Sequence, residues 1–581
     1  MLKKISQSNI ALWFLDLILL AFLIFDFGFE SYKDYRLYKL IALPALLIAL
    51  LGFNYFKYRN FNSNIKVKRS SRFNLTILSF LVLLELLLII FNYQNSFIET
   101  FFEERYVIEY GLLFYFFIRL TFFVRRIYDI YFNPAILFIG SFAIVALSGS
   151  FLLMLPEATT NGITFTDALF TSTSAVAVTG LIVLDTAKDF TPFGQTIIMV
   201  LFQLGGLGML TFTSFFAYFF KSGSSFKESL FMKDVLGNEK LSSIMQTAMR
   251  IVVFSLVVEG IGALLIFSSL EGDDTFQNRS FFAVFHAISA YCNAGFSTSS
   301  SGFYEEGLRF NYYMQWVVMV LIIFGGLGYS IASNFIQYTK RFLVNLFYKS
   351  RKKFIARIIT LNTKIVIYTT IILVVAGTGF FLISEQETNL AEHTSAFGKF
   401  TTAMFSSVTT RTAGFNTVDL TNFTIPGILF MIFLMWIGAS PASTGGGIKT
   451  TTFALATLNV FSIAKDKPNI EIGTRRVARE AVQRAFAIIS ISLASIGIGI
   501  LLLLILNPQF TLLQIAFETF SAYSTVGLSL GITSALSEPS KYVVIFLMFF
   551  GRIGLINFMI GILKSVNTNE YKYPKENILI N

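Results

Sequence analysis

Long runs of hydrophobic residues, separated by polar stretches, recur along the whole of this 581-residue chain. Each run is long enough to cross a hydrocarbon layer of about 30 Å as a helix that rises about 1.5 Å per residue. The pattern therefore predicts an all-α integral membrane protein. Four segments precede residue 130 and eight follow it, at residues 8–27, 37–56, 74–93, 108–124, 133–155, 193–220, 249–270, 312–338, 361–384, 426–460, 482–507 and 540–563.

Basic residues gather in the polar stretches that follow the even-numbered segments, for example at 66–72 after the second and 349–357 after the eighth. Clusters of Lys and Arg in short loops stay on the cytoplasmic side of a membrane. Lys3 and Lys4 fit the same side, so we expect a multi-pass protein of the cell (inner or plasma) membrane with both termini in the cytoplasm. This charge pattern supports twelve spans independently of hydrophobicity.

Composition narrows the function further. Hydrophobic residues make up 55% of the chain and charged residues 14%, against about 25% charged in a typical soluble domain. The net charge of +11 comes from the cytoplasmic loops, so it does not indicate a nucleic acid partner. One cysteine and two histidines exclude a disulfide framework and argue against a transition-metal site. They also leave too few acid–base groups for a membrane enzyme, and we expect no covalently bound cofactor.

A Ser- and Thr-rich run that ends in a small residue, a glycine and then Leu or Phe occurs four times among the last eight segments. The glycines lie 115, 119 and 113 residues apart, and such a regular period indicates a repeated structure. The four runs occupy residues 171–181, 285–296, 405–415 and 517–528, and their glycines are Gly180, Gly295, Gly414 and Gly527.

A second glycine-rich mark follows each of these glycines by 25, 30, 24 and 24 residues. One mark of either kind is typical of an ordinary loop or a helix-packing contact. Four copies of both, in the same order, predict a unit of helix, re-entrant loop and helix that is repeated four times. The second marks are Gly205-Gly-Leu-Gly208, Gly325-Gly-Leu-Gly328, Gly438-Ala-Ser-Pro441 and Gly551-Arg-Ile-Gly554.

A polar loop at membrane depth survives only where it is buried in protein or lines a watery path, because each unpaired backbone group in lipid costs several kcal/mol. Four copies around one axis would converge on such a path. A short helix before each glycine can point its negative carboxyl end at a cation. The glycine allows positive φ, so that successive carbonyl oxygens can turn inward and replace the water shell of an ion. The sequence thus predicts a pore for a monovalent cation.

At these residues the chain resembles the Trk/Ktr/HKT superfamily of K⁺ transporters, and in particular the bacterial Trk/Ktr membrane subunit. The resemblance covers about residues 133–565 and rests on four motifs. They are Ser-Ala-Val-Ala-Val-Thr-Gly-Leu (174–181), Arg-Thr-Ala-Gly-Phe-Asn-Thr-Val-Asp-Leu (411–420), Ser-Pro-Ala-Ser-Thr-Gly-Gly-Gly-Ile-Lys-Thr-Thr-Thr (440–452) and Ser-Thr-Val-Gly-Leu-Ser (524–529).

The resemblance implies four membrane–pore loop–membrane repeats around a single pore, in a homodimer controlled by a cytosolic ring of nucleotide-binding subunits. It implies K⁺ uptake, since all four filter glycines are present, with nucleotide only on the separate regulatory subunit. Backbone carbonyls would hold K⁺ at Ala177, Val178, Thr179, Gly180, Cys292, Asn293, Ala294, Gly295, Arg411, Thr412, Ala413, Gly414, Ser524, Thr525, Val526 and Gly527.

The resemblance also implies two gate elements below the filter. One is an intramembrane loop at Gly445, Gly446 and Gly447, with Lys449 after it. The other is Arg552, an arginine within an apolar helix, which would form an electrostatic barrier. A buried arginine can instead serve a structural ion pair. Glu518 is a candidate partner for Arg411.

These patterns divide the chain into an N-terminal extension of about four transmembrane helices, four pore repeats and a cytoplasmic tail. The role of the extension, which the minimal Ktr-like core lacks, stays open, as does coupling to Na⁺ or H⁺. A Na⁺-selective or Na⁺-coupled relative and a non-conducting sensor of the same fold are alternatives. The predicted units are residues 1–130, 131–248, 249–360, 361–480, 481–565 and 566–581.

Overall fold

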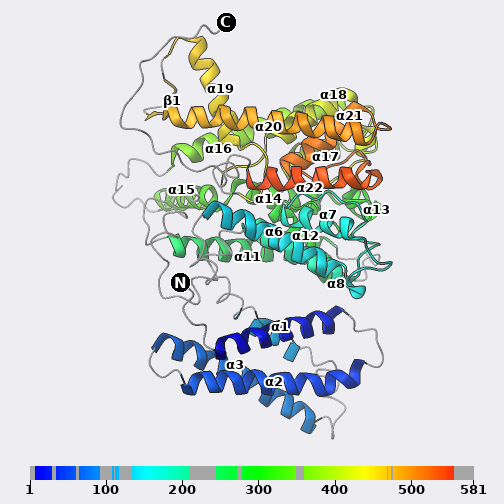
Figure 1. The fold of residues 1–581 in the computed structure, drawn as a ribbon. Helices are drawn as coiled ribbons and strands as arrows, with labels where there is room; N and C mark the ends of the chain where they lie inside the picture. Colours follow the sequence, from blue (N-terminus) through cyan, green and yellow to red (C-terminus); the bar gives the residue numbers. More distant parts are fainter. Residues whose placement is uncertain are drawn as a thin grey trace.

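The computed structural model describes most of the hydrophobic segments and the regions between them. The described residues are 7–28, 35–60, 65–91, 108–109, 111–116, 119, 134–208, 244–270, 278–347, 359–441, 443–467, 469–472 and 475–554. Among them the chain is almost entirely helical, which confirms the predicted fold class at this level. Figure 1 shows most of the helices running in a common direction, stacked side by side.

Four groups of three helices make up most of the described residues between 134 and 554. In each group a long helix is followed by a short helix and then by a third helix (Figure 1). Group 1 contains α6 (Pro134–Leu153), α7 (Phe165–Val176) and α8 (Pro192–Leu207), and group 2 contains α11 (Ile244–Ser269), α12 (Arg279–Cys292) and α14 (Tyr312–Leu327). Group 3 contains α16 (Leu361–Ser384), α17 (Ala396–Thr409) and α18 (Ile425–Trp436), and group 4 contains α20 (Arg479–Leu506), α21 (Leu512–Ser524) and α22 (Glu538–Ile553).

The other elements lie in the N-terminal extension or between the helices of these groups. The extension contributes α1 (Gln7–Gly28), α2 (Tyr35–Asn60) and α3 (Ile65–Phe91), while α15 (Tyr329–Phe347) follows α14 and α19 (Thr450–Ala464) follows α18. A short antiparallel pair joins β1 (Glu471–Ile472) to β2 (Arg475–Arg476), with Glu471 opposite Arg476. The remaining turns are α13 (Glu306–Arg309), η1 (Pro156–Ala158), η3 (Gly302–Tyr304), η4 (Leu420–Asn422) and η5 (Thr533–Ala535).

The third helix of a group is interrupted where the sequence predicts one continuous span. Segment 312–338 is wrong as a single straight span, because α14 ends at Leu327 and α15 leaves it at an angle of 106°. Gly328 makes the break with a φ of +75°, a conformation that glycine adopts without steric cost. Gly208 and Gly554 end α8 and α22 with φ values of +76° and +81°. In the first, second and fourth marks the last glycine therefore terminates its helix.

The described part of the extension packs as its own small bundle around leucines of α1, α2 and α3. Arg119, which interrupts the fourth predicted segment, forms an ion pair with Asp16 at 2.6 Å, and both side chains are largely buried. Residues 120–124 of that segment lie outside the described residues. The end of α1 meets group 1, where the Phe27 ring stacks on Phe193 with 6.4 Å between their centroids.

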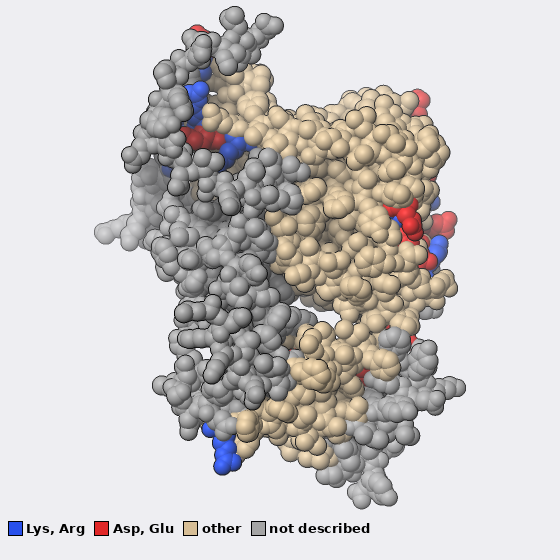
Figure 2. Space-filling model, in the orientation of Figure 1, with Lys and Arg blue, Asp and Glu red and all other residues tan. Residues whose placement is uncertain are grey.

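The outer surface of the helix groups matches a lipid environment. On the face in Figure 2, the charged side chains of the described residues gather towards the ends of the helices and leave a wide area without charge. Among the described residues, three helical stretches are long and apolar enough to cross a membrane, or four if the bent pair α14–α15 counts as one. The three are Met249–Ser269, Leu361–Ser384 and Arg479–Leu506. The count of twelve spans stays a prediction.

One ion pair joins group 4 to group 1. Lys541 of α22 lies 2.5 Å from the carboxylate of Asp167 in α7, and each side chain is less than a fifth exposed. Replacing Asp167 by Asn leaves a lysine that is partly buried without its counter-charge, so we expect the protein to lose about 1–3 kcal/mol of stability. The measurement is the thermal unfolding midpoint of the purified protein in detergent.

Lys188→Met is the matched control for this ion pair. It removes a 3.7 Å pair with Asp185 in which the lysine is 73% exposed, and such pairs contribute little. An Asp167→Asn midpoint no lower than that of Lys188→Met would show that the Asp167–Lys541 pair does not hold the two groups together.

Candidate functional site: a ring of four glycine segments

Each short helix ends three to five residues before one of the four repeated glycines. The glycines adopt φ values of +89°, +71°, +78° and +92°, as their residue type allows. The residue two positions earlier also has positive φ, which the sequence did not indicate, because these residues are not glycine. They are Val178, Asn293, Thr412 and Thr525, with φ values of +56°, +61°, +65° and +51°.

In groups 2 and 4 the residue with positive φ is also the residue that ends the short helix. At the ends of α12 and α21, Asn293 and Thr525 are the left-handed caps, and the next amide donates back to the helix, from Ala294 to Ser289 O at 2.7 Å and from Val526 to Ser521 O at 2.9 Å. Left-handed backbone is uncommon in β-branched residues such as valine and threonine. The same costly conformation in all four groups indicates that the backbone path itself is required.

The four glycines lie against one another in a closed cyclic order. A side-chain carbon added to Gly180 would meet Ala294 O at 2.5 Å, and one added to Gly295 would meet Ala413 O at 2.8 Å. A carbon added to Gly414 would meet Val526 O at 2.5 Å, and one added to Gly527 would run into Thr179 O. The order of contacts is therefore group 1, group 2, group 3, group 4 and back to group 1. We call this arrangement the glycine ring (residues 177–180, 292–295, 411–414 and 524–527).

Hydroxyl groups on the short helices hold the ring segments. Ser174 donates to Leu181 O at 2.7 Å and accepts from the Gly180 amide at 3.1 Å. Ser289 and Thr409 donate to the carbonyl that follows the glycine in their own groups, at 2.8 and 2.6 Å, and Ser521 accepts from the Gly527 amide at 3.1 Å. Sequence reasoning missed these roles, although the Ser- and Thr-rich runs contain all four residues.

The first glycine of the second mark lets the third helix approach the end of the short helix. In groups 1, 2 and 4, a side-chain carbon at Gly205, Gly325 or Gly551 would collide with a carbonyl oxygen at the end of α7, α12 or α21. Group 3 differs, because a carbon at Gly438 would collide with Gly446 O in the loop between α18 and α19. The interruption in group 3 thus occupies space close to the ring.

The loop between α18 and α19 lies directly against the ring. Carbons added to Gly445 and Gly446 would meet the hydroxyls of Thr412 and Thr525, and Gly447 lies beside Ser524. The Ser440 and Thr444 amides donate to the last carbonyls of α14, at 3.0 Å from Gly326 O and 3.3 Å from Gly325 O. The three predicted loop glycines are therefore packed against ring residues of groups 3 and 4.

Two cationic side chains hold this loop. Lys449 donates to Gly445 O at 2.6 Å, within the loop itself. Arg552, on α22, donates to Thr444 O and also to Gly205 O at the end of α8. Its guanidinium thereby connects groups 4, 3 and 1. Among the described residues Arg552 has no ion pair, so its partners are backbone carbonyls.

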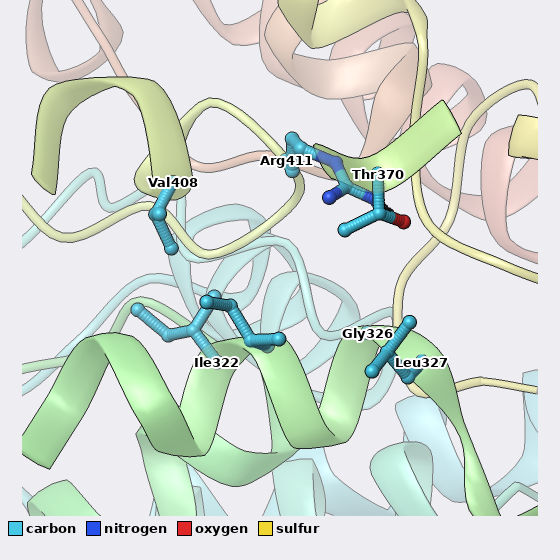
Figure 3. Close-up of a pocket in the computed structure, with 7 residues that line it drawn as sticks. Ile322, Gly326, Leu327, Thr370, Val408 and Arg411 are labelled. Atoms are coloured by element: carbon cyan, nitrogen blue, oxygen red, sulfur yellow. Dashed lines mark hydrogen bonds between the residues drawn. The ribbon is translucent and has the colours of Figure 1, made fainter. Parts of the chain in front are cut away.

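Arg411 begins the third ring segment, and its side chain lines a small cavity between groups 2 and 3. Figure 3 shows its guanidinium facing Thr370 of α16, to which it donates at 3.3 Å. Its Nε has no hydrogen-bond partner among the described residues. The cavity is lined by Ile322, Ile323, Gly326, Leu327, Thr370, Val408 and Arg411.

The suggested pairing of Arg411 with Glu518 is wrong. The Glu518 carboxylate accepts hydrogen bonds from Ser529, at 2.8 Å, and from Thr533, all within group 4. Short-range hydroxyl donors that follow the glycine satisfy this carboxylate, and they could not be recognised from the spacing of opposite charges alone.

The predicted site residues therefore come together in space. The structure brings the predicted filter residues of all four groups into the glycine ring and places Gly445, Gly446 and Gly447 against it. The Asn293 side-chain amide lies 3.3 Å from Thr412 Oγ1, which gives this unusual polar residue a neighbour in the next group.

Apolar helices that are long enough to cross a membrane define the chain as an integral membrane protein, and four of its glycine segments meet in a ring. The sequence matches the family described as TrkH: Cation transport protein over residues 124–571, and the chain belongs to this family. The extension up to residue 123 lies outside that match.

Proteins from bacteria are similar to this chain over most of their length. The Ktr system potassium uptake protein B of Vibrio alginolyticus is 37% identical over 76% of this chain and 93% of its own. The Potassium/sodium uptake protein NtpJ of Enterococcus hirae is 33% identical over 77% and 97%. The crystal structure of the potassium transporter TrkH from Vibrio parahaemolyticus shares the fold, with a TM-score of 0.58 and 18% identity over 74% of this chain and 85% of that one.

Proposed function

We propose that this chain takes up K⁺ across the cell membrane through the glycine ring, which acts as a selectivity filter of backbone carbonyl groups. The observation that carries this proposal is the closed cyclic contact of four segments with the same backbone twist. Carbonyl oxygens at such a ring can replace the water shell of a monovalent cation without a charged side chain. The name of the Ktr relative supports K⁺ as the ion.

In this proposal the four helix groups are four pore repeats around one pore, within residues 131–248, 249–360, 361–480 and 481–565. Residues 1–130 form an additional transmembrane unit, and residues 566–581 form a cytoplasmic tail. The loop at 445–447, with Lys449 and Arg552, is the gate, because it packs against the ring and is held by hydrogen bonds that can be exchanged. The basic loops place both termini in the cytoplasm.

The chain acts in this proposal as a homodimer with cytosolic nucleotide-binding regulatory subunits. The similarity to proteins named as parts of a Ktr system supports a membrane component of a larger assembly. Copurification of a tagged chain from its own cells tests this directly. Recovery of a stoichiometric cytosolic nucleotide-binding protein supports the proposal, and recovery of the chain alone under mild detergent contradicts it.

Transport itself is tested with the purified protein in liposomes. We expect K⁺ efflux down its gradient, and restored growth when the chain is expressed in cells that lack K⁺ uptake. A ring without flux for any monovalent cation would sink the proposal and favour the non-conducting sensor.

A Na⁺-selective or Na⁺-coupled transporter is the second candidate, and the relative named as a potassium/sodium uptake protein favours it. The same liposomes separate the two ions. If only Na⁺ crosses, or only Na⁺ restores growth, the K⁺ proposal fails. If K⁺ uptake requires a Na⁺ gradient, transport is coupled.

A further inference from the structure

The position nine residues before the ring glycine carries a different side chain in each group. In group 2 it is His286, which is fully buried in α12. Its Nε2 lies 2.9 Å from Ser297 Oγ, and Ser297 is the second residue after Gly295. Its Nδ1 lies 2.9 Å from Phe282 O in its own helix. One imidazole thus joins the short helix to the segment that leaves the ring.

In group 4 the same position is Glu518, which is also fully buried. Its carboxylate accepts a hydrogen bond from Ser529 at 2.8 Å, and Ser529 is likewise the second residue after its ring glycine, Gly527. A further bond from Thr533 fixes the other carboxylate oxygen. Groups 2 and 4 therefore share one device, in which a polar side chain of the short helix holds the hydroxyl two residues past the glycine.

Groups 1 and 3 lack this device. Their equivalent residues are Thr171, whose hydroxyl has no hydrogen-bond partner among the described residues, and Phe405, which packs on Phe303 with 6.2 Å between ring centroids. Because the cyclic order is 1, 2, 3, 4, the two held segments lie on opposite sides of the ring. Within the described residues, a side chain of the short helix therefore holds the residue two positions past the ring glycine in groups 2 and 4 only. This arrangement has two-fold rather than four-fold symmetry.

We propose that His286 and Glu518 are positioning residues for ion selectivity, acting through Ser297 and Ser529 on two opposite segments of the glycine ring. This inference rests on the proposed function of the ring as the filter. A carbonyl ring favours the larger ion only while its segments keep their spacing and their oxygens keep their direction. Hydrogen bonds from the short helices α12 and α21 fix two opposite segments, and this limits how far the ring can contract around a smaller ion.

The test is the K⁺/Na⁺ flux ratio of purified variants in liposomes, with monodisperse elution as the check on folding. Ser297→Ala and Ser529→Ala each remove one hydroxyl without a change of charge. Ser297 Oγ also accepts from the Ser299 amide at 3.0 Å, and Ser529 Oγ also accepts from the Gly531 amide at 3.1 Å and from Thr533 Oγ1 at 2.9 Å, so the His286 variants below isolate the bond from the short helix. Each serine variant is expected to lower the ratio about fivefold or more, and the double variant is expected to lower it further. Ser495→Ala is the matched control, because its hydroxyl bonds only within α20, to Ile491 O.

His286 offers a discriminating pair of variants. His286→Gln keeps a polar group near the position of Nε2, whereas His286→Asn keeps one only near Nδ1. We expect the Gln variant to retain the selectivity of the original protein and the Asn variant to match Ser297→Ala. A role in packing alone would affect both variants similarly.

Three results overturn the inference: equal ratios for the original protein and both serine variants, equal losses for His286→Gln and His286→Asn, or an equal loss for Ser495→Ala. Failure of the proposed function would look different, since the original protein would then carry no K⁺ at all.

Discussion

Gly180→Ser is expected to reduce the preference for K⁺ over Na⁺ by about tenfold or more. The new side chain would lie 2.5 Å from Ala294 O, so this carbonyl of the second ring segment must move. The φ of +89° adds strain of order 1–3 kcal/mol for a residue with a side chain, and about 1.4 kcal/mol corresponds to tenfold. The measurement is the ratio of K⁺ to Na⁺ flux in liposomes.

Gly162→Ser is the matched control. Gly162 has a similar φ of +77°, but no atom lies within 4 Å of the position where a side-chain carbon would stand. Gly162→Ser therefore introduces a similar backbone strain but makes no contact with the ring. Unchanged permeability ratios in Gly180→Ser, or an equal change in Gly162→Ser, would show that the contact with Ala294 O does not set selectivity.

The ring was predictable from sequence because its requirement is for backbone conformation. A glycine at the same place in four similar runs indicates a backbone conformation that other residues avoid. The structure gives all four glycines positive φ. The second set of positive φ values was not predictable, since Val178 and Thr412 are residue types that usually avoid it. Tertiary packing imposes it there.

The contacts of charged residues were the least predictable part of the site. Arg552 and Lys449 were recognised as unusual residues for a membrane, but their partners are carbonyl oxygens, which every residue carries. Glu518 was matched to the wrong partner because a carboxylate can be satisfied by nearby hydroxyls as well as by arginine. Long apolar segments likewise conceal a break such as the one at Gly328, since a single glycine scarcely changes their hydrophobicity.

Arg552→Ala is the second change with a large expected effect, and it should raise K⁺ flux about tenfold or more. The arginine donates to Thr444 O in the loop proposed as the gate and to Gly205 O of α8, and hydrogen bonds with charged donors contribute about 1.5–3 kcal/mol each. Its removal frees this loop and also takes a positive charge away from the proposed ion path. The measurement is K⁺ flux per protein in liposomes without any regulatory subunit.

Two further variants separate the tether from the charge. Arg552→Lys keeps the charge, but a single ammonium group cannot span two carbonyls as the planar guanidinium does. If flux stays low in Arg552→Lys, charge closes the path; if it rises as in Arg552→Ala, the hydrogen bonds to Thr444 and Gly205 hold the gate. Arg484→Ala, which removes an exposed arginine from α20, should leave flux unchanged. Loss of flux in a folded Arg552→Ala would instead show that this arginine maintains the conducting structure, because the ring would then depend on the connection that it makes between groups 1, 3 and 4.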